Sequence, residues 1–273
     1  MLSLRGWFGL ILIAVFWPMN WLLSGDRTAY LFFPLWLGYI LVVDALVERR
    51  RGSSIWKRSR RDFVLLFGLS IPEWWLFEVI NRRLGNWEYL GADHFSRTEY
   101  NILSTISFST VIPAVFGTAE LARSFRWIER LKNGPKAPAS RKAVMVYLCL
   151  GLAMFGSMIA WPRYCYPFAW TSLVFIFEPI NRAVGHPSLL QSLEQGDWRP
   201  ALSLATGSLI CGFFWEMWNF YSYPKWIYHT PGTEFLHVFE MPLLGYLGYI
   251  PFSFELFAMK NLLWPRAEHP KVG

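Results

Sequence analysis

Charged residues are scarce in this chain. They make up 16% of its 273 residues, whereas hydrophobic residues make up 54% and aromatic residues 19%. Ordinary soluble domains carry about 25% charged residues. The shortage excludes a typical soluble domain. Apolar runs of about 20 residues, each long enough to cross a hydrocarbon core of roughly 30 Å, recur along the sequence and indicate a polytopic helical membrane protein.

Cysteine and the common catalytic motifs are also rare. The chain has three cysteines without CxxC spacing, which excludes a disulfide framework and a zinc site: Cys149, Cys165 and Cys211. A glycine-rich phosphate loop and a nucleophile elbow are missing from the sequence. His237 and Glu240 are three residues apart and, with His229, form the best candidate metal site, but the chain offers no matching second set. We therefore expect no metal and require no redox cofactor.

The net charge of +7 is concentrated in two loops, which argues against nucleic-acid binding. Residues 48–61 and 123–142 hold most of the clustered Lys and Arg. Basic loops beside apolar spans lie on the cytoplasmic side of a membrane. Eight spans fit the hydropathy: residues 7–23, 30–47, 62–82, 102–122, 143–161, 166–183, 200–221 and 236–260. The fold class predicted is all-α, with the N and C termini cytoplasmic.

An internal repeat relates the two halves of the chain. Glu78 and Asn81 in "FEVIN" match Glu216 and Asn219 in "WEMWN" at an offset of 138 residues, and Asp44 matches Glu178 at 134. Four spans in each unit give both units the same orientation, so the repeat is parallel. The predicted organisation is a first four-helix repeat at 1–128, a basic linker at 129–142, a second four-helix repeat at 143–263 and a tail at 264–273.

Acidic residues inside the predicted spans are the candidate catalytic groups, because such residues usually mark functional sites or buried pairs. Basic residues that would neutralise them are nearly absent from the spans. An unpaired carboxyl in an apolar site favours its protonated form and can act as a general acid. The candidates fall into an outer and a cytoplasmic layer: Glu78, Glu216 and Glu240 in the first, Asp44 and Glu178 in the second.

Amides and aromatics surround the outer acids. In Glu-x-x-Asn the two side chains share a helix face, so the amide can orient the carboxyl. Aromatic faces stabilise cations, which suits protonation of a polyene. The structural alternatives are helix–helix contacts for Glu-x-x-Asn and interfacial belts for the aromatics. The candidate substrate-binding residues are Asn81, Asn219, Trp74, Trp75, Trp215, Trp218, Trp87, Tyr89, Trp226 and Tyr228.

The same elements resemble the small membrane-embedded lycopene cyclases, which occur as two homologous subunits or as one fused chain. "PLWLGYILVVDALVERRRG" looks like the first conserved element of that family, and Trp215-Glu216 looks like its Trp-Asp. Trp87 with Tyr89, and Trp226 with Tyr228, are similar to its exoplasmic aromatic element, and "FEMPLLGYLGYIPFSFE" is similar to its last element. The resemblance covers about three spans of each half. It implies acid-catalysed cyclisation of a carotenoid within the bilayer.

The sequence therefore predicts an integral membrane enzyme of cyclase or isomerase type, acting on an isoprenoid or carotenoid polyene by Glu acid/base catalysis. Its expected partners are a lipophilic isoprenoid or lipid ligand and membrane lipids, without nucleic acid. Its expected location is the bacterial inner membrane, with several passes. Two alternatives remain open: a proton-coupled transporter or lipid-handling protein, and a noncatalytic subunit of a membrane complex.

Overall fold

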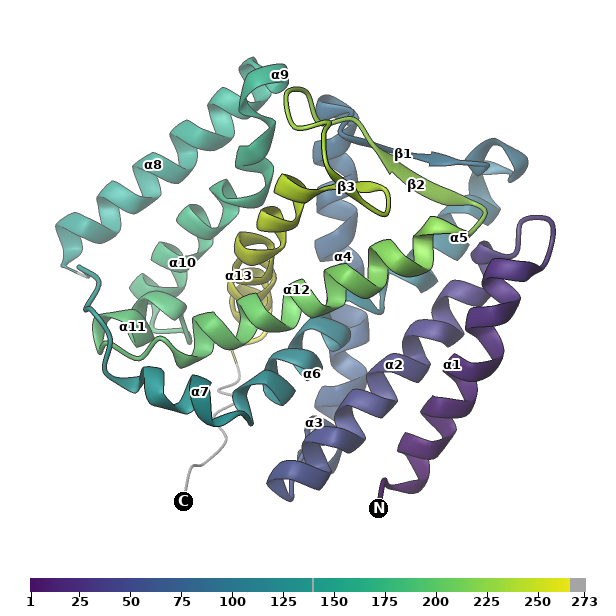
Figure 1. Ribbon diagram of the computed structural model, residues 1–273. Coiled ribbons are helices and arrows are strands. Elements are labelled where there is room, and N and C mark those ends of the chain that lie inside the picture. Colours follow the sequence, from purple (N-terminus) through teal and green to yellow (C-terminus); the bar gives the residue numbers. More distant parts are fainter. Residues whose placement is uncertain (139, 266–273) are drawn as a thin grey trace.

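The protein is mostly helical in a computed structural model that describes residues 1–138 and 140–265 (Figure 1). Helices account for 75% of the chain. The elements are α1 Leu4–Leu22, α2 Thr28–Arg51, α3 Ile55–Arg58, α4 Arg60–Leu84, β1 Trp87–Leu90, η1 Ala92–His94, α5 Arg97–Phe108, α6 Val111–Arg123, α7 Arg126–Glu129, η2 Arg130–Lys132, α8 Arg141–Ala160, α9 Pro162–Cys165, η3 Tyr166–Trp170, α10 Ser172–Val184, α11 Leu189–Glu194, α12 Arg199–Phe220, β2 Lys225–Tyr228, β3 His237–Val238, β4 Met241–Pro242, η4 Leu243–Gly248 and α13 Tyr249–Leu263.

Four helical segments are long and apolar enough to cross a membrane, which is compatible with a membrane protein. They are Thr28–Arg51, Arg60–Leu84, Arg97–Arg123 and Arg141–Ala160. The third comprises α5 and α6, which are separate helices because the chain turns at Ser109 and Thr110. Apolar composition and helical length thus agree in these segments.

Helix ends follow the local sequence. Gly85 and Gly185 each cap a helix, α4 and α10 respectively, in the left-handed conformation, with φ of 64° and 78°. Glycine adopts this conformation without the steric cost of a Cβ atom. Ser54 and Ser188 cap the starts of α3 and α11 by accepting a backbone N–H, as serine commonly does at this position.

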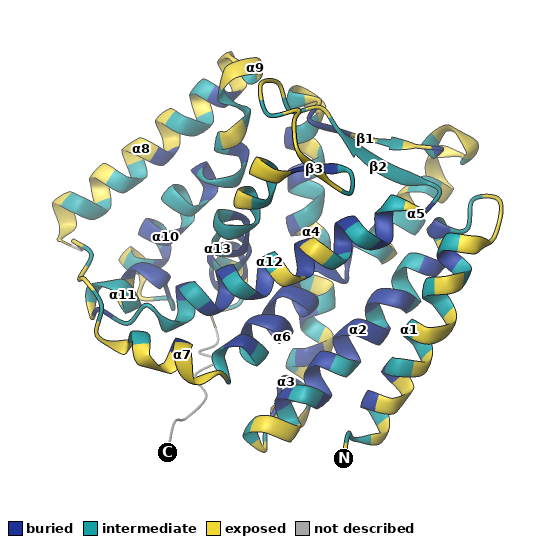
Figure 2. Cartoon of the chain, viewed as in Figure 1, coloured by how far each residue is buried: buried dark blue, intermediate teal, exposed yellow. Residues whose placement is uncertain are grey.

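The centre of the bundle is formed by α4, α6, α12 and α13, with α1 and α2 on one flank and α8 and α10 on the other (Figure 1). Helix α6 is buried over most of its length, whereas α8 is largely exposed (Figure 2). Gly207 lets α12 approach α6 closely, because a Cβ there would lie 2.5 Å from the backbone nitrogen of Ala119. The core therefore joins the two halves of the chain.

The two ends of the bundle differ in character. The strands β1, β2 and β3 lie at one end, and α3, α7 and the start of α1 lie at the other (Figure 1). The short helices α3 and α7 belong to the two basic segments of the sequence. The aromatic and basic connections are thus separated by the length of the helices.

The structure corrects two expectations about the fold. The chain is not all-α, because it contains two small two-stranded sheets, β1–β2 and β3–β4. The predicted span at 236–260 is helical only from Tyr249, and residues 237–248 form β3, β4 and the 3-10 helix η4. Gly245, Gly248 and Pro242 weaken an α-helix there. Of the predicted tail at 264–273, residues 266–273 lie outside the described part of the chain.

Candidate functional site

Strands β1 and β2 pair antiparallel although they come from opposite halves of the chain. Trp87 lies opposite Tyr228, and Tyr89 lies opposite Trp226. Each strand has the sequence Trp-x-Tyr. In the antiparallel pair, the tryptophan of each strand therefore lies opposite the tyrosine of the other. The outer aromatics that the sequence singled out are therefore brought together.

The asparagine of each Glu-x-x-Asn motif fixes one strand to the end of its helix. Asn81 donates to the carbonyl of Trp87 at 2.7 Å and accepts its backbone N–H at 3.3 Å. Asn219 donates to the carbonyl of Trp226 at 2.7 Å and accepts its N–H at 3.0 Å. The two amides bind strand backbone, so they position the aromatics and do not themselves line the cavity described below.

The carboxyl of Glu78 is held by aromatic donors. Its Oε1 accepts the hydroxyl of Tyr89 at 2.6 Å and the indole N–H groups of Trp74 and Trp87 at 3.0 and 3.2 Å. Burial, and then the neighbouring carboxyl, raise the pKa of the Tyr89 hydroxyl above its ordinary value. That phenol therefore stays protonated and continues to donate.

The carboxyl of Glu216 is fully buried and held differently. Its Oε1 accepts the hydroxyls of Tyr228 at 2.7 Å and Tyr249 at 2.6 Å, while Trp226 donates to the Tyr228 oxygen at 2.8 Å. Its Oε2 is buried and has no hydrogen-bond partner among the described residues. Burial raises the pKa of Tyr228 as well. One oxygen of the Glu216 carboxyl thus accepts hydrogen bonds from two phenols, and the other accepts none from the described residues.

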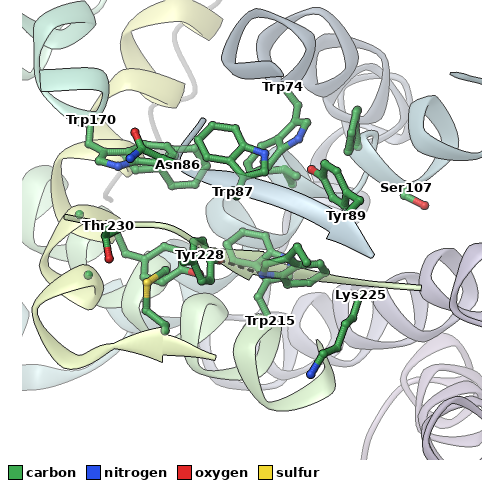
Figure 3. Close-up of a pocket in the computed structure, with 18 of the residues that line it drawn as sticks. Trp74, Asn86, Trp87, Tyr89, Ser107, Trp170, Trp215, Lys225, Tyr228 and Thr230 are labelled. Carbon is green, nitrogen blue, oxygen red and sulfur yellow. Dashed lines mark hydrogen bonds between the residues drawn. The ribbon is translucent and has the colours of Figure 1, made fainter. Parts of the chain in front are cut away.

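A cavity of about 440 Å³ lies beside the β1–β2 ladder, between the halves of the chain (Figure 3). Its volume is within the range of roughly 300–1,000 Å³ typical of ligand sites. Figure 3 shows Trp74, Trp87 and Tyr89 along one side and Tyr228 and Trp215 along the other. Lys225 is the only charged side chain among the described residues that line it. The cavity suits an apolar or aromatic ligand.

Six of the ten predicted substrate-binding residues line this cavity: Trp74, Trp87, Tyr89, Trp215, Trp226 and Tyr228. Trp75 instead donates to the Thr105 hydroxyl at 3.1 Å, and Trp218 packs on Trp36 with ring centroids 5.0 Å apart. Glu78 and Glu216 do not line the cavity either. They lie behind its wall and reach it through the tyrosines to which they are hydrogen-bonded.

The second acidic layer lies far from this cavity, beside α3 and α11. Asp44 accepts the backbone N–H of Trp56 at 3.1 Å, and Glu178 accepts that of Leu190 at 3.0 Å. These two bonds join residues separated by 12 positions in each half. The Asp44 bond holds α3 against α2, and the Glu178 bond holds α11 against α10. Each carboxyl therefore has a structural role.

Several acids have basic partners that the sequence did not suggest, because the partners come from helix ends and loops. Arg5 pairs with Asp44 at 2.7 Å, and Arg58 with Glu120 at 2.5 Å. Glu240 lies in the β3–β4 turn, outside any helix, and pairs with Lys225. Asp44, Glu120 and Glu240 are therefore paired with basic residues that lie outside the predicted spans.

Sequence reasoning did not identify Tyr249 and Trp170 as site residues. Tyr249 directly precedes Ile250-Pro251, which matches Ile112-Pro113 at the offset of 138 residues, and the Tyr249 hydroxyl donates to Glu216. Trp170 stacks on Trp87 with centroids 5.8 Å apart and lines the cavity. Trp170 and Trp36 are 134 residues apart, the same offset that relates Glu178 to Asp44, so the sequence carried a signal for Trp170. Tyr249 carried none, since Val111 stands at the equivalent position.

Comparison with known proteins found no match: no protein-family model, no curated protein and no solved structure is similar to this chain.

Proposed function

We propose that this chain is a multi-pass protein of the bacterial inner membrane that modifies a lipophilic isoprenoid polyene, as a cyclase or isomerase. One observation carries the proposal: an aromatic cavity is bordered by phenols that are hydrogen-bonded to buried carboxyls, Glu78 on one side and Glu216 on the other. An acid next to apolar, aromatic walls can protonate a double bond and protect the resulting cation from water. The sequence resemblance to membrane-embedded lycopene cyclases points to the same chemistry.

The proposal includes two parallel four-helix repeats with eight spans. Equivalent hydrogen bonds support it: each Glu-x-x-Asn amide binds the backbone of its own Trp-x-Tyr strand, and Asp44 and Glu178 each bind a backbone N–H that lies 12 residues further along. The register of β1 with β2 is also unchanged when the two halves are exchanged. A two-fold axis between the strands would produce this pattern.

Glu216 is the proposed acid. For the transfer, the Glu216 carboxyl rotates so that its proton faces the phenol oxygen, and the hydroxyl of Tyr228 or Tyr249, which donates to Oε1 at rest, turns its own proton towards the cavity. The carboxyl proton then passes to the phenol oxygen as the phenol proton moves to a carbon of the double bond, whose π electrons form the new C–H bond. The cation left on the neighbouring carbon lies against aromatic faces such as Trp215 and Trp87. Loss of a proton from the substrate to the Tyr89–Glu78 pair completes a cyclisation or isomerisation without oxidation or reduction.

The two carboxyls differ in a way that favours Glu216 as the acid. Three donors converge on one oxygen of Glu78, which suits a carboxylate. Glu216 receives two phenols on Oε1, and its Oε2 has no partner among the described residues. A protonated carboxyl needs only one acceptor oxygen, so this arrangement tolerates a proton on Oε2.

Replacement of Glu216 by glutamine tests the acid role. Glu216→Gln keeps an oxygen that can accept both phenols but removes the transferable proton, so the structure should be retained and conversion of a polyene should fall about 100-fold or more. The assay incubates membranes containing the protein with C30 to C50 polyenes and identifies products by mass spectrometry. Tyr249→Phe should lower conversion less, because Tyr228 remains hydrogen-bonded.

Two outcomes would refute the proposal in different ways. Full conversion by Glu216→Gln of every polyene that the wild type converts would remove Glu216 from the mechanism. If the wild type converts no polyene, lipids extracted from the purified protein decide the class. A bound phospholipid or polar solute would favour a lipid-handling protein or transporter, which the lack of a carboxyl among the described cavity-lining residues also favours. A co-purifying protein would indicate a noncatalytic subunit.

A further inference from the structure

The segment of residues 235–247 is apolar and largely exposed, and it contains no α-helix. It includes β3, β4 and most of η4. Large apolar side chains in it are exposed to between 37% and 69% of their full area: Phe235, Leu236, Val238, Leu243, Leu244 and Leu247. Its only Asp, Glu, Lys or Arg is Glu240, which is paired with Lys225. Exposed apolar side chains that follow one another this closely mark a surface that contacts an apolar partner.

The segment is also continuous with the cavity. Leu244 and Leu247 are exposed and line the cavity together with Met241, whereas the exposed Phe235, Leu236 and Leu243 do not line it. The same short stretch therefore has one side towards the ligand site and another towards the surroundings. A ligand that entered the cavity past this segment would stay in contact with apolar side chains throughout.

The backbone of the segment is held in an unusual conformation. Leu236 and Phe239 have φ of 52° and 60°, and they are the only non-glycine residues with positive φ in the described chain. Strain of this kind persists where surrounding contacts enforce it, and it often occurs at ligand clamps and switches. Here Phe239 packs on Phe213 and Phe220 of α12, with ring centroids 5.6 Å apart in both pairs.

An ion pair holds the segment to β2, and a side-chain hydrogen bond lies within the segment. Lys225 of β2, which lines the cavity, forms an ion pair with Glu240 in the β3–β4 turn. Tyr246 donates to the carbonyl of Val238 at 3.1 Å. The ion pair is the main polar link between the segment and the β1–β2 ladder, and it is only about one-fifth exposed.

We propose that residues 235–247 lie in the outer interface of the bilayer, in contact with lipid acyl chains, and form the lateral port through which a lipophilic ligand reaches the cavity. The Lys225–Glu240 pair is the latch of this port. Lipid is the partner because the segment lies at the strand-bearing end of a chain with membrane-length helices (Figure 1). Non-helical backbone is tolerated at the interface, where water and headgroups satisfy it, and not in the hydrocarbon core. The port rests on the proposed function in two respects, the membrane location and the lipophilic ligand.

Nitroxide labels measure the membrane contact directly. Leu236→Cys and Leu243→Cys are made in a chain that also carries Cys149→Ser and Cys165→Ser, and the labelled protein is placed in phospholipid nanodiscs. The control is Thr98→Cys, an exposed polar position in the first turn of α5. Collision rates with oxygen, which concentrates in lipid, are compared with those of a water-soluble nickel chelate. We expect the oxygen-to-nickel ratio at both leucine positions to exceed that at Thr98 several-fold.

Two results would overturn the port. Ratios at Leu236 and Leu243 equal to that at Thr98 would place the segment in water. Labels that neither reagent reaches would show that protein covers the segment, for example a second copy of the chain. Both results are independent of whether the cavity binds a polyene.

The latch is tested with all-trans-retinol in phospholipid vesicles as the probe, by energy transfer from tryptophan. Glu240→Gln should raise the rate of retinol transfer into the protein several-fold, because the segment opens more often. An unchanged transfer rate would refute the latch. If retinol does not bind the wild-type protein, the polyene ligand of the proposed function fails, while the label ratios still decide the placement of the segment. If retinol binds and the labels are aqueous, only the port fails.

Discussion

Asn219 offers the sharpest test of how the site is held together. It is 1% exposed, and its amide makes both a donor and an acceptor bond to the backbone of Trp226, at 2.7 and 3.0 Å. Asn219→Ala removes both partners at once. Leaving a buried backbone group unpaired costs about 1–3 kcal/mol. Because Trp226 is only partly buried, we take the lower part of that range twice and expect a loss of roughly 2–4 kcal/mol in the free energy of unfolding.

The loss should be measured by unfolding the purified protein with increasing SDS in mixed micelles and extrapolating to zero SDS. Asn81→Ala removes the equivalent bonds to Trp87 and should cost a similar amount. Asn101→Ala is the matched control, because Asn101 is exposed on α5 and its loss should change stability by about 0.5 kcal/mol or less. If Asn219→Ala is no more destabilising than this control, the amide does not anchor β2 and the reasoning fails.

Three further predictions concern other parts of the molecule. Gly9→Val should destabilise the protein by about 1–3 kcal/mol in the same SDS assay, because a Cβ at Gly9 would lie 2.6 Å from a backbone oxygen of α2; unchanged stability would show that α1 and α2 separate freely. Arg5→Ala should cost roughly 3–5 kcal/mol, since it leaves the buried carboxylate of Asp44 without its ion pair, and a double-mutant cycle with Asp44→Asn should recover part of the loss. The hydrogen bond from His94 to Asp26, and then the charge of Asp26, raise the pKa of His94 above its ordinary value. This contact therefore stabilises the fold fully below about pH 6.5, and less as the pH rises through the folded pKa. Asp26→Asn should lower the pKa of His94 in an NMR titration.

Much of the outer site follows from sequence spacing. Glu78 with Asn81 and Glu216 with Asn219 were identified as related pairs, and both amides make the same bonds to a strand that follows them. Spacing succeeds here because the partners are local: the asparagine and the strand it binds are separated by six or seven residues. A hydrogen bond between a helix end and the strand that follows it depends little on the rest of the fold.

The basic partners of the acids could not be predicted in the same way. Arg5 reaches Asp44 across 39 residues, and Arg58 reaches Glu120 across 62. Lys225 lies 15 residues before Glu240. Long, flexible side chains near helix ends can turn towards a buried carboxyl, and hydropathy does not record which one they reach.

The sequence by itself determined that the chain is mostly helical, rich in membrane-length apolar segments and punctuated by glycine caps such as Gly85 and Gly185, because composition and capping act over a few neighbouring residues. Only the tertiary structure decided that β1 pairs with β2 across the two halves, and that Tyr249 joins Tyr228 on Glu216. It also decided that Glu78 and Glu216 lie behind the cavity wall, since residues more than 100 positions apart meet only when the helices pack. Composition and capping residues determined where the helices form, and packing between helices that are distant in sequence formed the cavity.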